Sequence, residues 1–158
     1  MKKEDFEIAN YLLASKLKRF LNFIIDAIII MIIVRVVIQF LNILEISNTI
    51  NSFDRIERYL FWSGVSFVYY GITESFFSRS PAKYLTKTIV VMADGSKPTL
   101  MVILVRTIFR ILPLEPLSFL RGRALGLHDE NSRTFVVIKS KFEMQMKEHF
   151  ELLSLDKS

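Results

Sequence analysis

Hydrophobic positions along the chain fall into two long blocks with polar stretches between them. The first block, residues 20–44, has 25 residues and only two charged side chains, Asp26 and Arg35. As a helix it would reach about 37 Å, more than the roughly 30 Å of hydrocarbon in a bilayer. The second block, residues 60–77, is just long enough to span and carries aromatic residues at both ends. The pattern predicts two transmembrane helices rather than two buried helices of a soluble protein.

A third apolar stretch, residues 99–120, resembles a span but is interrupted. It contains Arg106 and Arg110, and Pro113 follows them. Proline ends a helix at the residues before it, so we expect a helix over about 99–112. This helix is predicted to be amphipathic and either interfacial or re-entrant, and a true third span is the alternative.

Apolar residues at helical spacing also flank the blocks. In the cytoplasmic segment 1–19 they are Phe6, Ala9, Leu13 and Leu17, and before the second block they are Ile50, Phe53, Ile56 and Leu60. Both stretches are predicted to be surface helices in the headgroup region. In the tail, residues 139–158, the pattern is Phe142, Met146, Phe150 and Leu153. The tail is expected to form a surface or partner-binding helix, with a solvated, frayed tail as the alternative.

Two short runs are typical of β-strands. Residues 88–92 are β-branched and apolar and precede a turn signal at 93–96, and residues 133–139 form a second such run. We expect the two to pair into a small cytoplasmic β element. The predicted fold class is therefore an α-helical integral membrane protein with two transmembrane helices, a third amphipathic or re-entrant helix and this β element.

Composition removes several classes of function. The 158 residues include no Cys and only two His, which excludes a disulfide framework, a thiol nucleophile and a zinc–thiolate site. No metal and no cofactor is expected. The net charge of +5 comes from basic residues spread before the first block and after the second. By the positive-inside rule both termini are cytoplasmic, in a multi-pass protein of the cell membrane. This spread favours anionic lipid headgroups over nucleic acid as the partner.

Asp26 is the most informative charged residue, because a carboxylate inside a span costs a few kcal/mol, about 2.5–3.5 on insertion scales. Arg19 lies seven positions earlier and therefore on the same helix face, but we expect it to extend outward to the interface. Arg106 and Arg110, four residues apart on the third segment, are the predicted partners of Asp26, with ordered water as the alternative. The hypothesis is that this segment docks against the first span and neutralises Asp26.

Three further residues are candidates. Glu74 lies near the cytoplasmic end of the second block and supports either a functional or an interfacial interpretation. Asp129 follows His128 in a polar stretch, where an Asp usually caps or turns the backbone. No nucleophile motif or phosphate-binding loop accompanies His128 and Asp129, so enzyme activity is not expected.

The spacing of these residues resembles the RDD family of small membrane proteins, which is named after one arginine and two aspartates. Arg19, Asp26 and Asp129 match those three positions. The segment 78–98 resembles the family's stretch after the second span through Pro81, Lys83, Val90, Val91, Gly95 and Pro98. The third segment and the closing motif match through Arg106, Arg110, Pro113, Glu115, His128, Asp129 and Thr134. At two positions where the family has other small residues, this chain has Ser78 and Ala82, which is a modest departure. The resemblance covers residues 15–138.

The resemblance implies two spans and no established general activity, with cation/proton exchange suggested for some members. We expect a structural or regulatory membrane module that acts through partners, either another membrane protein or further copies of itself in a homo-oligomer. The alternative is a proton- or sodium-coupled transport component that uses Asp26.

Overall fold

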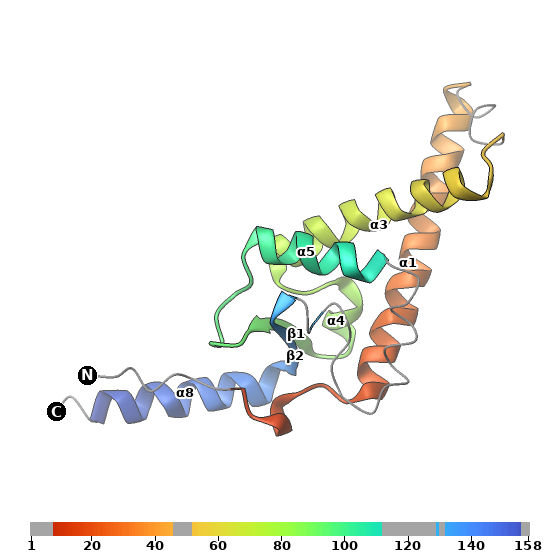
Figure 1. Ribbon diagram of the computed structural model, residues 1–158. Helices are drawn as coiled ribbons and strands as arrows, with labels where there is room; N and C mark the ends of the chain where they lie inside the picture. Colours follow the sequence, from red (N-terminus) through yellow and green to blue (C-terminus); the bar gives the residue numbers. More distant parts are fainter. Residues whose placement is uncertain (1–7, 46–51, 112–128, 130–131, 156–158) are drawn as a thin grey trace.

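Helices dominate the structure, a computed structural model that describes residues 8–45, 52–111, 129 and 132–155. The longest are α1 (Lys16–Ile43) and α3 (Arg55–Phe77), and the shorter α5 (Leu100–Ile111) lies along α3 (Figure 1). Helix α1 has no internal Gly or Pro, and the Ser15 side chain caps its start by accepting a hydrogen bond from the Lys18 backbone N–H.

Helix α3 has defined ends. Asp54 and Glu57 form a reciprocal capping box at its start. At its end Ser78 adopts a left-handed conformation with φ 55°, which turns the chain back toward α1. The separate surface helix expected before residue 60 is not seen in the described residues, because Ile56 belongs to α3 itself. Residues 46–51 lie outside the described part.

Among the described residues, α1 is the one helix long and apolar enough to cross a bilayer. Its most apolar window has a mean hydropathy of 2.6, and only 22% of that window is buried. The structure is thus mostly helical, with one candidate membrane-spanning helix and a two-stranded sheet. The number of spans stays a prediction.

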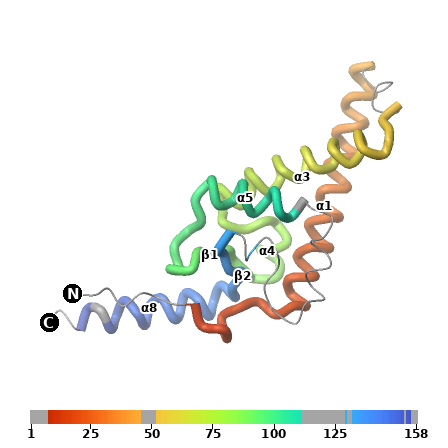
Figure 2. Tube along the Cα trace, viewed as in Figure 1, coloured from red at the N-terminus to blue at the C-terminus, as the bar shows by residue number. Residues whose placement is uncertain are grey.

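The remaining elements form a smaller layer beside α1 and α3. They are the short helix α4 (Pro81–Leu85), the strands β1 (Thr88–Met92) and β2 (Thr134–Ile138), and helix α8 (Lys139–Leu155). The strands pair antiparallel with Val90 opposite Val136, which confirms the predicted β element. Helix α8 follows β2 and extends away from the other helices (Figure 2). Its Phe142 packs on the sheet cluster, whereas Phe150 is exposed.

The expectation of an amphipathic N-terminal helix is wrong for the described residues from Ile8 onward. This stretch contains a short 3-10 helix, Asn10–Leu12, followed by extended backbone. Leu13 forms a β-bridge with Val137, and the Ala14 N–H donates to the Val136 carbonyl at 2.8 Å. The free edge of β2 offers these hydrogen bonds, and they outweigh the helical pattern of the sequence.

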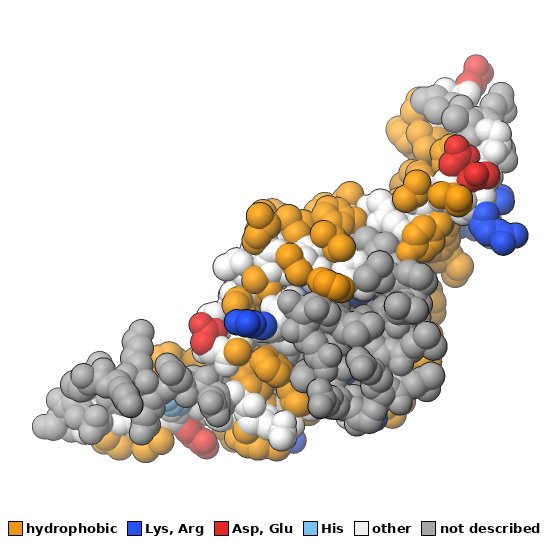
Figure 3. Space-filling model, in the orientation of Figure 1, with side chains coloured by type: hydrophobic (Ala, Val, Ile, Leu, Met, Phe, Trp, Pro, Cys, Tyr) orange, Lys and Arg blue, Asp and Glu red, His pale blue; other side chains and the backbone are white. Residues whose placement is uncertain are grey.

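Three helices share an unusual arrangement: several of their charged and polar side chains are buried, while many of their large apolar side chains are exposed. The buried residues of α1 include Arg19, Asn22 and Asp26. The exposed residues include Ile28, Ile32 and Val36 on α1, Val68 and Ile72 on α3, and Leu100, Met101 and Ile108 on α5. Figure 3 shows hydrophobic side chains spread over the outer surface of these helices. In water this distribution would be reversed.

We predict that Leu12→Ala destabilises the protein by about 2–5 kcal/mol, because the side chain is fully buried between Val91 and Val137 and its loss leaves a cavity. The measurement is denaturant-induced unfolding in detergent micelles. Leu17→Ala is the matched control, since Leu17 is 67% exposed. Equal losses from the two variants would contradict the assigned core.

Candidate functional site: a buried ion-pair network

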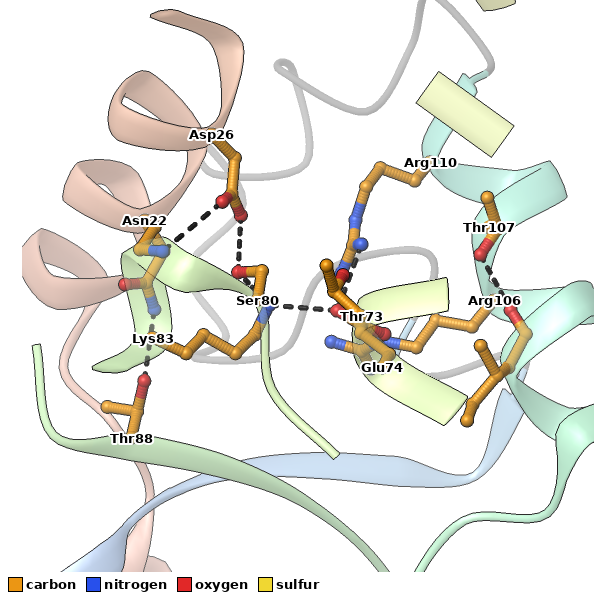
Figure 4. A network of polar contacts seen from close by, with 12 residues as sticks. Asn22, Asp26, Thr73, Glu74, Ser80, Lys83, Thr88, Arg106, Thr107 and Arg110 are labelled. Carbon is orange, nitrogen blue, oxygen red and sulfur yellow. Dashed lines mark hydrogen bonds and ion pairs between the residues drawn. The ribbon is translucent and has the colours of Figure 1, made fainter. Parts of the chain in front are cut away.

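Glu74, in the last turn of α3, lies at the centre of a cluster of cations and is fully buried. Its Oε1 accepts hydrogen bonds from Lys83 Nζ at 2.9 Å and from Arg110 Nη1 at 3.1 Å. Its Oε2 accepts from Arg106 Nε at 3.1 Å. One carboxylate therefore joins α3 to α4 and α5 (Figure 4).

Local structure explains how these residues meet. Arg106 and Arg110 are four residues apart and lie on the face of α5 that packs against α3. The left-handed turn at Ser78 reverses the chain after α3, so that Lys83 on α4 returns to Glu74. The Arg110 guanidinium also stacks on the Tyr70 ring, with 3.9 Å between its central carbon and the ring centroid.

Asp129 extends the network to α1 and β2. Its two carboxylate oxygens pair with Arg106 and with Arg19, and all three side chains are buried. Arg106 also donates a hydrogen bond to Thr134 Oγ1 at 2.6 Å, and Thr134 is the residue at which β2 begins. Arg106 therefore lies between two carboxylates, Glu74 and Asp129. The expectation that Arg19 extends outward is wrong, because pairing with Asp129 holds it inside.

Asp26 has a different environment from Glu74. Its oxygens accept hydrogen bonds from the Tyr69 hydroxyl and the Ser80 hydroxyl, each at 2.6 Å, and from the Ala82 backbone N–H at 3.4 Å. All three donors are neutral. Ser80 Oγ in turn accepts from Lys83 Nζ at 3.3 Å, which connects Asp26 indirectly to the ion pairs.

The hypothesis that Arg106 and Arg110 neutralise Asp26 is therefore wrong. Helix α5 packs mainly against α3, whereas α1 packs against α3 and α4. Glu74 faces α5 and occupies both arginines, and the chain reversal after α3 brings the Ser80 hydroxyl to Asp26 instead.

A second set of hydrogen bonds ties α1 to β1. Asn22 Nδ2 donates to Thr88 Oγ1 at 3.2 Å, and Thr86 Oγ1 donates to Asn22 Oδ1 at 2.6 Å. Asn22 lies one turn before Asp26 on the buried face of α1. The polar face of α1 is thus hydrogen-bonded over several turns.

The cluster contains more cations than carboxylates, and burial affects the pKa of one of these cations. Among the described residues, three buried cations (Arg19, Lys83 and Arg106) and Arg110, whose side chain is 10% exposed, meet three buried carboxylates (Asp26, Glu74 and Asp129). Desolvation lowers the pKa of the Lys83 ammonium, and the neighbouring Glu74 carboxylate opposes that shift. The surroundings of Lys83 therefore disfavour its charge, whereas the Glu74 carboxylate favours it.

The structure brings most of the predicted residues together. Arg19, Glu74, Arg106, Arg110 and Asp129 form one network, and Asp26 joins it through Ser80. His128 lies outside the described residues. Sequence reasoning placed Lys83 only as a family position and missed the roles of Ser80 and Tyr69. The contacts of Lys83 and Ser80 depend on the chain reversal at Ser78, and the contact of Tyr69 depends on the packing of α3 against α1. No local pattern of the sequence predicts either.

A charged interior beneath apolar helix surfaces defines a class: small helical proteins organised around a buried ion-pair network. The model of one protein family, the RDD family, matches residues 13–140. The chain belongs to the RDD family, as the spacing of Arg19, Asp26 and Asp129 predicts. No curated protein and no solved structure shows significant similarity to the chain. Family membership and the apolar helix α1 together suggest a membrane protein.

We predict that Glu74→Gln destabilises the protein by about 3–5 kcal/mol. Among the described residues it removes the one carboxylate that pairs with Lys83 and Arg110, and it leaves their charges uncompensated. Thermal unfolding in detergent followed by circular dichroism measures the loss. Glu143→Gln is the control: its side chain is 61% exposed, and its pair with Lys139 contributes little. A Glu74→Gln variant as stable as this control would show that the network does not hold the helices together.

Proposed function

We propose that the chain is a multi-pass membrane module in which α1 and α3 are the two spans, and that its buried ion pairs lock the helices together. The observation that carries the proposal is the inverted distribution of side chains. Apolar residues such as Ile32, Val68 and Ile108 cover the outside, while Asp26 and Glu74 are buried. A bilayer stabilises this arrangement because its hydrocarbon accepts the apolar surface that water would not.

Charge distribution supports an orientation with both termini in the cytoplasm of a cell-membrane protein. On the opposite side, the connection after α1 and the first turn of α3 carry only two arginines, Arg55 and Arg58, together with acidic residues. Residues 1–19 hold five lysines and arginines and the residues after α3 hold thirteen, so eighteen of the 21 in the chain lie on the proposed cytoplasmic side. In this orientation the sheet and α8 are cytoplasmic, and α5 lies at the cytoplasmic interface.

The network favours a structural or regulatory role over chemistry. Glu74 and Asp129 each contact at least two cations, and the ion pairs link four helices. Arg106 also donates a hydrogen bond to Thr134, the first residue of β2. Such a network fixes one arrangement of helices. The module would then act through a partner, either another membrane protein or a second copy of this chain.

Single-cysteine labelling tests the topology, because the chain contains no cysteine of its own. We expect Glu45→Cys, after the end of α1, to react with a membrane-impermeant maleimide in intact cells. Ser140→Cys, at the start of α8, should react only after permeabilisation. Labelling of both sites, or of neither, in intact cells would contradict two spans with cytoplasmic termini.

A transport component coupled to protons or sodium is the second candidate, and the surroundings of Asp26 favour it. This buried carboxylate has neutral donors from Tyr69, Ser80 and Ala82. A carboxylate in such surroundings can exchange a proton or a cation without breaking an ion pair. Two spans do not enclose a pathway, so transport would require an oligomer or a partner.

Flux in proteoliposomes separates the two candidates. Asn at position 26 keeps one oxygen that can accept from Tyr69 or Ser80, and its amide NH2 can donate to the other hydroxyl, so Asp26→Asn is expected to fold. If the chain transports, proton or sodium flux by the wild type should fall to background in Asp26→Asn. Under the module proposal the wild type and Asp26→Asn show equal background flux. Size-exclusion chromatography and circular dichroism check that both proteins are folded.

A further inference from the structure

Arg79 differs from the cations of the network, because no carboxylate pairs with it in the described part of the chain. It directly follows Ser78, the left-handed residue at the end of α3. Its Nε is buried without a hydrogen-bond partner, and no other hydrogen bond from its guanidinium is seen among the described residues. Arg19, Arg106, Arg110 and Lys83, in contrast, all contact Glu74 or Asp129.

Aromatic rings hold the Arg79 side chain in place. Its guanidinium carbon lies 3.8 Å from the centroid of the Tyr84 ring, a cation–π contact. The Tyr84 ring in turn meets Phe77 edge-on, with 6.5 Å between the centroids. Stacking of this kind leaves the planar edge of a guanidinium, which carries its N–H donors, available to a ligand.

The surroundings of Arg79 combine exposed apolar side chains with a second cation. Phe76 is 70% exposed and Leu85 is 71% exposed. Lys97 Nζ donates to the Phe76 carbonyl at 3.1 Å, so its ammonium also lies at the end of α3. We name Arg79, Tyr84, Phe76, Phe77, Leu85 and Lys97 the Arg79 corner.

We propose that the Arg79 corner binds the phosphate of an anionic membrane lipid, with the acyl chains along the apolar surface of Phe76 and Leu85. The proposal rests on the membrane setting proposed above, which puts this end of α3 at the cytoplasmic headgroup level. A guanidinium pairs with two phosphate oxygens at once, and Lys97 adds a second positive charge. Apolar side chains beside the two cations match the division of a lipid into head and tail.

Lipid retention tests the proposal. The protein is reconstituted in nanodiscs of phosphatidylcholine with an equal part of phosphatidylglycerol, extracted in mild detergent, and its bound lipids are counted by native mass spectrometry. We expect the wild type to retain phosphatidylglycerol preferentially. Arg79→Gln should lower that preference about tenfold, since a charge-assisted hydrogen bond contributes enough for such a factor.

Matched variants show whether the Arg79 guanidinium itself causes the preference for phosphatidylglycerol. Arg58→Gln, at the opposite end of α3, removes one exposed cation and should leave retention unchanged. Arg79→Lys keeps the charge but loses the planar fork, and should lose most of the preference. Tyr84→Leu removes the ring that orients Arg79 and serves if Arg79→Gln does not fold. Wild-type retention by Arg79→Lys, or equal losses in Arg58→Gln and Arg79→Gln, would overturn the proposal.

Two further outcomes separate this inference from the membrane proposal. A wild type that inserts but shows no preference for phosphatidylglycerol contradicts only the Arg79 corner. A wild type that stays soluble without detergent contradicts the membrane setting itself. Inorganic phosphate, added to the protein in phosphatidylcholine alone, should not raise its melting temperature; an increase as large as that from phosphatidylglycerol would assign the site to free phosphate instead.

Discussion

Arg106 is the residue on which the arrangement of the helices depends. Its guanidinium lies between Glu74 and Asp129 and also donates to Thr134, so one side chain of α5 ties the end of α3 to the start of β2. None of these groups reaches water, and a buried charge is tolerated only when it is paired and hydrogen-bonded. The positions of α3, α5 and the sheet are therefore coupled, because displacing any one would leave a charge uncompensated.

This requirement explains why the apolar side chains lie outside. Charged and polar side chains occupy much of the inner faces of α1, α3, α4 and α5. Little buried space is therefore left for Ile, Val, Leu and Phe side chains. Only two small apolar clusters are found in the described residues, one between α1 and α3 and one on the sheet. The ion-pair network thus leaves apolar surface exposed, and the membrane setting proposed above would cover that surface with lipid.

Two buried carboxylates in neighbouring helices, Glu74 and Asp26, have different kinds of hydrogen-bond partner. Glu74 is surrounded by Lys83, Arg106 and Arg110, which fix it as a structural carboxylate. Asp26 receives neutral hydrogen bonds and connects to the cations only through Ser80. If any residue of this chain exchanges an ion, Asp26 can do so with the least disturbance of the helix packing, whereas Glu74 belongs to the architecture.

Local pattern predicted α1, α3, α5, α8, the two strands and the family, because hydrophobic runs, β-branched stretches and spaced motifs are properties of neighbouring residues. It did not predict α4, and its N-terminal helix was wrong. It also singled out Arg19, Asp26, Glu74, Arg106, Arg110 and Asp129 as charges in apolar or motif positions. Only the tertiary structure decided their pairing. The left-handed turn at Ser78 brings Ser80 to Asp26 and Lys83 to Glu74, and the face of α5 that packs on α3 directs its arginines to Glu74. Charge and helical periodicity are local, but which opposite charge lies within 4 Å depends on how distant segments pack.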